Sequence, residues 1–373
     1  MEHLGDDNDY LMWLSIENIL TSSPATWRTY AESLYDYFSW LRANNLEWDA
    51  KPKKGPHVEE ISNIALYRNW SLNLTHPETG LQKIQPSTVR RRLTNLMSFY
   101  RWAHSRERID FLPWSSEFRI VREVHPSMFR HTHAGRVVSR DNLRPKARKK
   151  AVQLLSMDQC HDLLHACNTT TLQLMTKLML LTGLRNEECR TFPRKYVFDP
   201  TGLHERKRIP LNLDPADMAL KGSKPRRIYV SWLLMKEIFD YLNFGEGAFR
   251  AKRYRKLSGE RSPFTFLSCE GKPWKEKGLN NAYRKLWEKG GRKTPVLAFR
   301  VTPHMLRHTF ATFELYSEST RTNIGSALAW VRDRLGHSSI STTTMYVHCL
   351  DLIEEVELNT YQQELDKMLS REM

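Results

Sequence analysis

The sequence has few cysteines, and they follow no pattern of known chemistry. Its five cysteines form no CxxC pair and no zinc-binding spacing, and an odd, scattered set is typical of reduced thiols in a cytosol. No apolar run is long enough to span a membrane, and the acidic start MEHLGDDNDY carries no signal-peptide pattern. The sequence also lacks a carboxylate cluster for magnesium and a phosphate loop of the GxxxxGK[ST] kind. We therefore expect a cytoplasmic protein with no membrane contact.

Positive charge is what the sequence has in excess. Lys and Arg total 57 against 42 Asp and Glu, which gives the 373 residues a formal net charge of +15. Such an excess favours a polyanionic partner, most simply DNA or RNA, over a merely basic enzyme. The length is sufficient for two domains, each with a hydrophobic core of its own.

Residues 1–115 have the apolar periodicity of helices. Ser23 and Pro24 are typical of a helix cap and a first helical position, and Ser87 predicts the cap of a second long helix. Three consecutive arginines of that second helix lie off its apolar stripe, so they are either a solvated surface or contacts to a DNA backbone. The two stripes are formed by Trp27, Ala31, Leu34, Phe38 and Leu41, and by Val89, Leu93, Leu96, Tyr100 and Ala103.

Residues 116–154 differ from the helices before them. The stretch RVVSRDNLRPKARKK is basic, polar and weakly periodic, which predicts a linker able to lie along a phosphate backbone. A later basic stretch, FRAKRYRKLSGER, has aromatic residues among its cations and is a further candidate for DNA contact. The candidate DNA contacts in the helical region, the linker and this later stretch are Arg90, Arg91, Arg92, Arg144, Lys146, Arg253 and Arg255.

A second domain is expected over residues 155–349. Ser156 and Gln159 have capping-box spacing, and a strongly apolar helix is closed by Gly183. The segments KYVF, KRIPLNL, DMALKG and RRIYVS then predict a small antiparallel sheet, and the rest of the domain is expected to be mostly helical. The expected fold class is therefore mainly α with a small antiparallel β-sheet (α+β).

The stretch HMLRHTFAT concentrates polar chemistry in this domain. Thr302 and Pro303 predict a helix start, and His304, Arg307 and His308 would share one face of its first turns. A helix N-terminus with an added arginine suits an anion, so we predict a phosphate site. Two histidines four apart are also a metal-ligand spacing, but the arginine between them would repel a cation. A structural role in the core is the alternative for the second histidine.

Three further segments offer what a reactive phosphate site needs. Leu335 and Gly336 predict a helix end with His337 just beyond it, and Tyr346 follows nine residues later on a short Ser/Thr-rich helix. A phenol is a poor nucleophile unless cations or a base favour the phenolate, so an isolated tyrosine would be read as a packing residue. Upstream, TGLRNEE and KGSKPRR place Arg185 in a turn and Lys221 at a hairpin tip, where both could reach a phosphate.

Four segments, in order, resemble the tyrosine recombinase (phage integrase-like) family. They are LLTGLRNEE, LKGSKPRRIYV, TPHMLRHTFAT and LGHSSISTTTMY, and the resemblance covers about Leu155 to Tyr346. It implies a catalytic domain at 155–349, preceded by a helical core-binding (SAM-like) DNA-binding domain at 1–115. The acidic residues 350–373 are implied to be a C-terminal helix that docks on a neighbouring protomer, and a helix folded back on its own domain is the alternative.

The resemblance also implies roles for individual residues. Two arginines would clamp the scissile phosphate, and a tyrosine would attack phosphorus to give a 3′-phosphotyrosyl enzyme. A lysine would protonate the leaving 5′-oxygen, one histidine would accept the proton of the tyrosine, and another would bond the phosphate. Strands then rejoin without ATP, metal or another cofactor. The implied catalytic residues are Arg185, Lys221 (with Lys224 as the alternative), His304, Arg307, His337 and Tyr346, braced by Glu188 and His308.

The implied function is site-specific recombination of double-stranded DNA. Four cleaved strands imply a homotetramer on two DNA sites, from a monomer or weak dimer off DNA, with DNA-bending proteins as further partners. Long spacings between the four segments favour an integrase or transposase of a mobile element, acting at a bacterial nucleoid. The alternatives are DNA relaxation of the type IB topoisomerase kind, or a non-catalytic DNA-binding regulator with the same fold.

Overall fold

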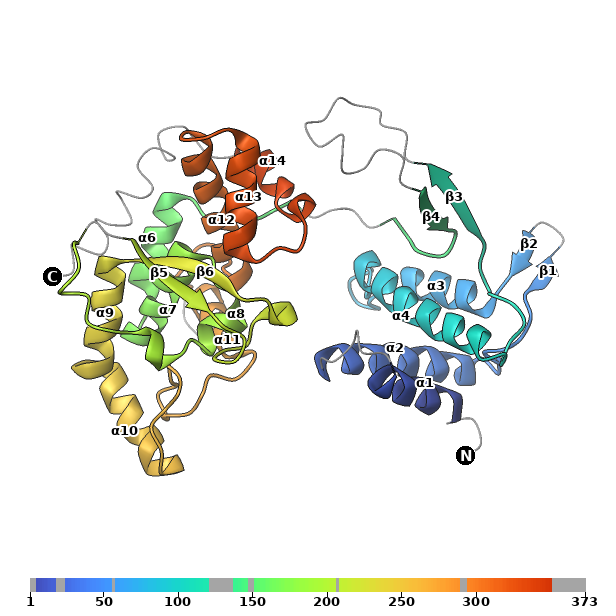
Figure 1. Cartoon of the computed structure of the whole chain (residues 1–373). Helices are drawn as coiled ribbons and strands as arrows, with labels where there is room; N and C mark the ends of the chain where they lie inside the picture. The colour runs from blue at the N-terminus through green and yellow to red at the C-terminus, as the bar shows by residue number, and fades with distance from the viewer. Residues whose placement is uncertain are drawn as a thin grey trace. The chain divides into compact units, whose positions relative to one another are not determined.

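The computed structural model describes residues 5–17, 24–55, 58–120, 137–146, 151–205, 208–288 and 294–350. The chain divides into two compact units, Met1–Lys150 and Ala151–Met373 (Figure 1). In the described parts both units are mainly helical, and each strand pairs with one antiparallel neighbour. The predicted fold class, mainly α with a small antiparallel sheet, is therefore confirmed. No described helix has the length and apolar character needed to cross a membrane.

The first unit is a group of helices with two hairpins attached. Among the described residues of this unit, helix α4 packs against α1, α2 and α3, and α2 packs against both α1 and α3. The helices are α1 (Gly5–Ile16), α2 (Pro24–Ala43), α3 (Asn63–Asn73) and α4 (Pro86–Ser105), and the strands are β1 (Lys53–Gly55), β2 (Val58–Ile61), β3 (Ser116–Ile120) and β4 (Val137–Asp141).

The core of this unit is rich in buried tyrosine. The hydroxyls of Tyr37 and Tyr100 lie 2.7 Å apart, and Tyr100 donates to the carbonyl of Trp48 at 2.7 Å. Such buried hydroxyls need partners, and here they find them in one another and in the backbone. The predicted apolar stripes are confirmed at their centres, where the side chains of Leu34, Leu41, Val89, Leu93, Leu96, Tyr100 and Ala103 are buried.

Two details of the first unit differ from the predictions. Helix α4 begins at Pro86 and is capped by Gln85, so Ser87 lies inside the helix; proline fits the first helical position and moves the start one residue earlier. The predicted linker contains β3 and β4, which pair in antiparallel register from Ser116 opposite Asp141 to Ile120 opposite Val137. Periodicity is a weak signal in strands this short, which is why the hairpin was missed.

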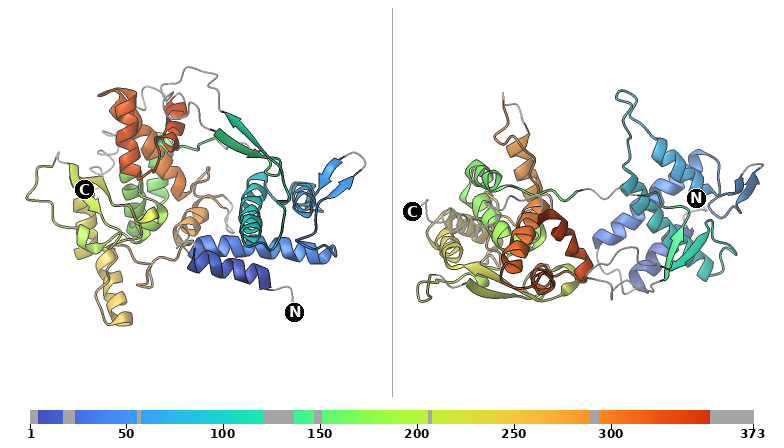
Figure 2. Two further views of the ribbon diagram at one scale, coloured as in Figure 1. Left: turned by 45° about the vertical axis from the view of Figure 1, so that its right-hand side comes forward. Right: turned by 90° about the horizontal axis from the view of Figure 1, so that it is seen from above.

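The second unit is built around a buried helix. In α7 nearly every residue is buried, and the helix packs against α12, α9 and strand β6. Helices α12 and α13 lie next to each other, as the orange and red ribbons of Figure 2 show. The helices are α6 (Met157–Ala166), α7 (Thr170–Thr182), α8 (Asn186–Arg190), α9 (Trp232–Asn243), α10 (Glu246–Ser258), α11 (Gly278–Trp287), α12 (Pro303–Ser319), α13 (Ile324–Leu335) and α14 (Val347–Leu350), and the strands are β5 (Arg208–Leu213) and β6 (Arg226–Ser231).

The helix ends of the second unit follow the predicted signals. Ser156 and Gln159 form the capping box of α6, Gly183 ends α7 in a left-handed conformation, and the Thr302 side chain caps α12 with Pro303 at its first position. The sheet is smaller than predicted. The segments RIPLNL and RRIYVS form β5 and β6, whereas KYVF and DMALKG lie outside strands. The Tyr196 hydroxyl instead donates to Asp217 and accepts from the backbone N–H of Asp214, so it joins the two segments through side-chain bonds.

Gly183 is expected to tolerate no side chain. Its φ is +65°, and a Cβ would lie 2.3 Å from Phe310 Cδ1 and 2.9 Å from Leu335 Cδ2, both buried side chains. Gly259 caps α10 with a similar φ of +79° but has open space around it. We expect Gly259→Ala to lower the free energy of unfolding by about 1 kcal/mol through backbone strain alone.

Gly183→Ala is expected to cost about 2 kcal/mol more, because overpacking adds to the strain. Chemical denaturation of the two variants measures the difference. Equal losses would show that the core around Phe310 can yield.

Candidate active site

The second unit brings the predicted site residues together from four segments. Arg185 is the N-cap residue of α8 and Glu188 lies within that helix, and Lys221 begins the 3-10 turn η4 (Lys221–Ser223) between the two strands. His304, Arg307 and His308 come from the first turns of α12. His337 follows α13, and Tyr346 ends the 3-10 turn η6 (Thr344–Tyr346), where a short helix was predicted.

Arg307 lies at the centre and is only 2% exposed. One guanidinium nitrogen donates to the carbonyl of Gly183 and another to the carbonyl of Leu335, each at 2.6 Å. The side chain therefore joins the end of α7 to the end of α13. Burial, with the positive charge of Arg185, lowers the pKa of Arg307 to about 9. The low value reflects first the loss of water around the guanidinium and then the positive charge beside it.

Glu188 organises a second arginine. Its carboxylate is 1% exposed, accepts from the Arg185 backbone N–H at 2.7 Å and pairs with the Arg185 side chain at 2.9 Å. Burial alone would raise the pKa of Glu188, but hydrogen bonds and charges from arginines hold it below its ordinary value. A buried carboxylate that stays charged is an anchor for cations, which is the bracing predicted for this residue.

Arg226 is a second arginine that binds Glu188, and the sequence analysis did not predict it. It donates to both oxygens of Glu188, at 2.9 and 2.6 Å, and its Nε donates to the carbonyl of Arg334 at 2.9 Å. The Arg226 side chain is 5% exposed although it is the first residue of β6. A signal for it was Glu188: a buried carboxylate has more lone pairs than one arginine can fill, which predicts a second donor.

The last turn of α13 accepts hydrogen bonds from all three arginines. The carbonyls of Arg334, Leu335 and Gly336 receive Arg226, Arg307 and Arg185 at 2.9, 2.6 and 3.4 Å, respectively. The last carbonyls of a helix have no intrahelical partner and carry the negative end of the helix dipole. The end of α13 is therefore a suitable place to hold cations side by side.

The tyrosine lies beside this cluster and is buried. Tyr346 is 1% exposed, and its hydroxyl lies 3.0 Å from Nδ1 of His308. Burial raises the pKa of Tyr346 to about 12, although Arg307 opposes this shift. The ring of His337 is nearly parallel to that of Tyr346, with centroids 6.4 Å apart, and its Nδ1 lies 3.1 Å from Thr343 Oγ1. The hydrogen-bond partner of the tyrosine is thus His308, whereas the resemblance had assigned its proton to His304.

The histidines are neutral in this environment. Burial, followed by the charge of Arg307, lowers the pKa of His337 to about 3. Burial, then His304 and Arg307, lower the pKa of His308 to about 4. His304 is exposed, its ring lies 4.2 Å from that of His308, and its pKa is lowered by burial and by nearby cations that include Lys221. The charge of Lys221 is the smallest of these contributions to the lowered pKa of His304.

The predicted DNA contacts outside the site fall into two groups. Two of the arginines are held by carboxylates: Arg92 pairs with Asp36 at 2.7 Å and Arg144 with Asp141 at 2.5 Å. Arg92 is thereby directed toward its own unit. The other five side chains are exposed, and they are Arg90, Arg91, Lys146, Arg253 and Arg255.

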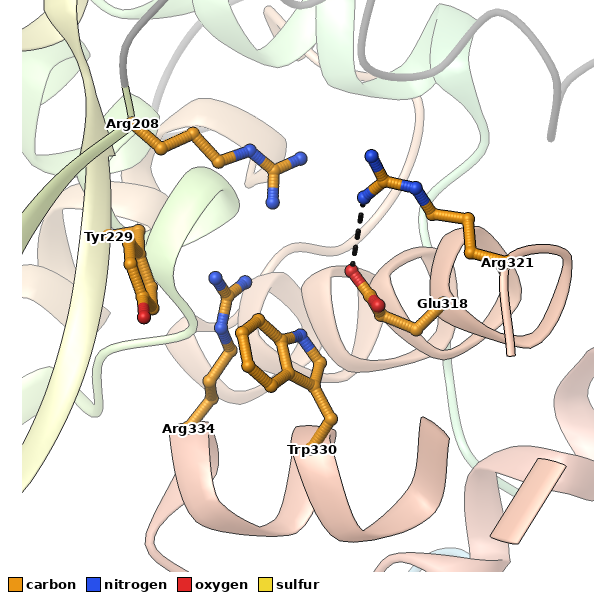
Figure 3. A pocket seen from close by; sticks show the side chains of 6 residues that line it. All are labelled: Arg208, Tyr229, Glu318, Arg321, Trp330 and Arg334. Carbon is orange, nitrogen blue, oxygen red and sulfur yellow. Dashed lines mark ion pairs between the residues drawn. The ribbon is translucent and has the colours of Figure 1, made fainter. Parts of the chain in front are cut away.

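A pocket of about 360 Å³ borders the side chain of Arg334 (Figure 3). The Arg334 guanidinium lies 4.5 Å from the ring centroids of both Tyr229 and Trp330 and forms an ion pair with Glu314. Two more arginines line the pocket, and each has a carboxylate nearby: Arg208 lies 3.6 Å from Glu314, and Arg321 lies 3.5 Å from Glu318. Glu314 and Glu318 thus offset much of the charge of the three arginines, and the contacts of Arg334 anchor the last turn of α13.

Residues 153–352 match the model of the phage integrase family, which is more than half of the chain. The chain belongs to the phage integrase family, the tyrosine recombinases. It is 29% identical over 273 residues to tyrosine recombinase XerC of Halalkalibacterium halodurans, covering 72% of this chain and 73% of the relative. It is 26% identical over 351 residues to XerC of Oceanobacillus iheyensis, covering 91% and 90%. The resemblance is confirmed, and this recombinase is an enzyme that cleaves and rejoins DNA.

Solved structures of tyrosine recombinases share the fold. The integrase of the Tn1549 transposon, solved with a circular intermediate DNA, has a TM-score of 0.55 at 16% identity and covers 90% of this chain and 93% of its own. The XerH site-specific recombinase, solved with a palindromic difH substrate after cleavage, has a TM-score of 0.54 at 15% identity, with coverages of 87% and 76%.

The lowered histidine pKa values predict acid sensitivity. The unfolded chain binds protons at these imidazoles near their ordinary pKa of 6.5, whereas folded His308 and His337 stay neutral down to about 4 and 3. Their contribution to stability is complete above pH 6.5 and is lost as the pH falls toward those values. We expect His308→Gln and His337→Gln each to reduce the fall in melting temperature between pH 7 and pH 4.5, a range in which unfolded imidazoles bind protons and these two folded ones stay neutral.

The exposed His348 provides the control, and His348→Gln should follow the wild-type curve. A pH dependence that is the same in all four proteins would contradict the assignment.

Proposed function

We propose that this recombinase cuts and rejoins two DNA sites through a 3′-phosphotyrosyl intermediate at Tyr346. The observation that carries the proposal is the arrangement around this tyrosine: two arginines held at the end of α13 and a neutral imidazole 3.0 Å from its hydroxyl. The phenol oxygen forms a bond to phosphorus while the bond from phosphorus to the 5′-oxygen breaks. A 5′-hydroxyl of another strand later reverses the reaction, so the phosphodiester energy is kept.

Arg185 and Arg307 are proposed to hold the nonbridging oxygens of the scissile phosphate. Arg307 is fixed by two carbonyls and Arg185 by Glu188, so both are oriented before DNA binds. Charge placed in advance where negative charge develops is usually the largest catalytic contribution. We further assign His337 to a hydrogen bond with the same phosphate.

The proton of the tyrosine is proposed to leave toward a histidine. A DNA phosphate cannot reach a side chain that is 1% exposed, so Tyr346 must move outward before it reacts. His304 is the exposed histidine and lies against His308, which places it on the accessible side. We therefore assign proton acceptance in the reacting arrangement to His304, and the holding of the buried phenol to His308.

Lys221 is proposed to give its proton to the leaving 5′-oxygen. It is exposed in η4, between the two strands, and its charge is among those that lower the pKa of His304; Lys224, just after η4, is the alternative. The proton lost by the phenol and the proton gained by the 5′-oxygen balance each other. The step needs no ATP because one phosphorus–oxygen ester bond replaces another.

The proposed partner is double-stranded DNA, bound as two sites. Exchange requires four cleaved strands, which a homotetramer on DNA would supply from monomers or weak dimers, with DNA-bending proteins as further partners. The long spacings from Arg185 to Lys221 and from Arg307 to His337 support an integrase or transposase of a mobile element that acts at a bacterial nucleoid. The proposed docking helix at 350–373 lies outside the described residues, apart from Leu350.

Covalent trapping tests the nucleophile. We expect the protein, mixed with DNA that flanks its gene in the presence of EDTA and quenched with SDS, to form an adduct that maps to Tyr346. Tyr346→Phe should abolish the adduct, because the phenol oxygen is the atom that bonds phosphorus. Tyr316→Phe, in α12 of the same unit, is the matched control and should retain it.

An adduct that survives Tyr346→Phe would contradict the assignment. Binding without any adduct would favour a non-catalytic regulator, and relaxation without joined sites would favour a topoisomerase.

A sulfur-substituted substrate tests the lysine. In a 5′-bridging phosphorothiolate the leaving atom is sulfur, and a thiolate leaves without a proton because thiols have a pKa of about 8.5. We expect Lys221→Ala to slow cleavage of ordinary DNA by about 10²–10⁴-fold and to recover on the sulfur substrate. Lys224→Ala should match wild type on both. If Lys224→Ala is the variant that is slow on ordinary DNA and recovers on the sulfur substrate, the role belongs to Lys224. If neither variant recovers on the sulfur substrate, neither lysine is the general acid.

A further inference from the structure

Glu188 is shared between two arginines of different status. Arg185, whose side chain is 23% exposed, can still reach a ligand, whereas the side chain of Arg226 is 5% exposed. One oxygen of Glu188 accepts from both guanidinium groups at 2.9 Å, and the other accepts from Arg226 at 2.6 Å and from the Arg185 backbone. The carboxylate thus accepts four hydrogen bonds, and two of them come from the arginine whose side chain is buried away from DNA.

Arg226 also holds the surface on which the other arginines rest. Its Nε donates to the Arg334 carbonyl, directly before the carbonyls of Leu335 and Gly336 that receive Arg307 and Arg185. Its side chain passes so close to this turn that a Cβ on Gly336 would lie 3.0 Å from Arg226 Cδ. One side chain therefore contacts both the carboxylate and the helix end that orient the phosphate-binding arginines.

We propose that Arg226 is a positioning residue for the arginine clamp. The proposal rests on the function proposed above. Arg226 occupies Glu188, so that Arg185 gives one guanidinium hydrogen bond to the carboxylate and one to the Gly336 carbonyl, and keeps its remaining N–H groups for the phosphate. It also fixes the last turn of α13, whose carbonyls set the separation of Arg185 and Arg307.

The side-chain contacts of Arg334 also hold the last turn of α13. The carbonyl of Arg334 faces Arg226, while its guanidinium lies between Tyr229 and Trp330 and pairs with Glu314 (Figure 3). The turn is therefore held from two directions, by β6 through Arg226 and by the aromatic pair through Arg334. Without Arg226, the buried charge of Glu188 would have Arg185 as its nearest guanidinium and would draw it away from the phosphate.

The decisive measurement compares two substrates at saturating protein. A methylphosphonate at the scissile position removes one negatively charged oxygen, so cleavage of this neutral linkage depends less on a positioned positive clamp. We expect Arg226→Gln to slow single-turnover cleavage of ordinary DNA by about 10²-fold, the typical cost of misplacing catalytic groups by about 1 Å. On the methylphosphonate substrate the loss should shrink to less than about tenfold, while the affinity for DNA stays near wild type.

Two further variants keep the test independent of folding. Arg226→Lys retains a charge beside Glu188 but not the three-way contact, so it should fold with nearly wild-type melting temperature and show the same substrate-dependent loss in milder form. Arg227→Gln is the matched control, because its neighbouring side chain is exposed and bonds Asn212 instead. At saturation it should cleave both substrates at the wild-type rate.

Three outcomes would overturn the proposal. Arg226→Gln or Arg226→Lys could cleave ordinary DNA at the wild-type rate, or lose the same factor on both substrates, which would indicate a general structural role. An Arg227→Gln loss as large as that of Arg226→Lys would show that position 226 is not special. Adduct formation by the wild type is the reference throughout: its absence counts against the proposed function, whereas a normal wild type with an unaffected Arg226 variant counts only against this inference.

Discussion

The site depends on one constraint: several positive charges must lie close together in a place with little water. Arg185, Arg226 and Arg307 would repel one another if left alone. The fold offsets the repulsion with a buried carboxylate, Glu188, and with the unpaired carbonyls at the ends of α7 and α13. Burial, and after it these charges, keep His308 and His337 neutral, and in the proposed reaction the anionic phosphodiester would add the negative charge that balances the arginines.

The sequence allowed much of this site to be predicted, for physical reasons that apply residue by residue. Gly183 and Pro303 mark helix ends by backbone chemistry that is local, so the ends of α7 and the start of α12 could be placed. Arg185, Arg307 and Tyr346 were found because they lie in segments with a recognisable order. Arg226 was missed although it stands in one of those segments, since its role depends on Glu188, thirty-eight positions earlier, and on the carbonyl of Arg334.

The differences from prediction also have a common cause. KYVF and DMALKG have the residue types of strands, but side-chain bonds of Tyr196 and Asp217 fix them as loops. The strands β3 and β4 have only five residues each, so their pairing is not visible in apolar alternation. The partner of Tyr346 is His308 rather than His304 because the phenol points into the protein, and the direction of a side chain is set by packing that no spacing rule contains.

Arg307 connects two helices through its guanidinium group. By bonding the carbonyls of Gly183 and Leu335 at once, it ties the end of α7 to the end of α13, so sliding one helix past the other would break two charged hydrogen bonds in a dry environment. Tyr346 nevertheless has to travel to meet a phosphate. The travel must therefore begin after Gly336, in the stretch of short 3-10 turns from His337 to Tyr346, where few regular backbone bonds resist it. In the proposed reaction Tyr346 would therefore move while Arg185 and Arg307 stay in place. The phenol oxygen could be withdrawn without disturbing the groups proposed to bind the phosphate.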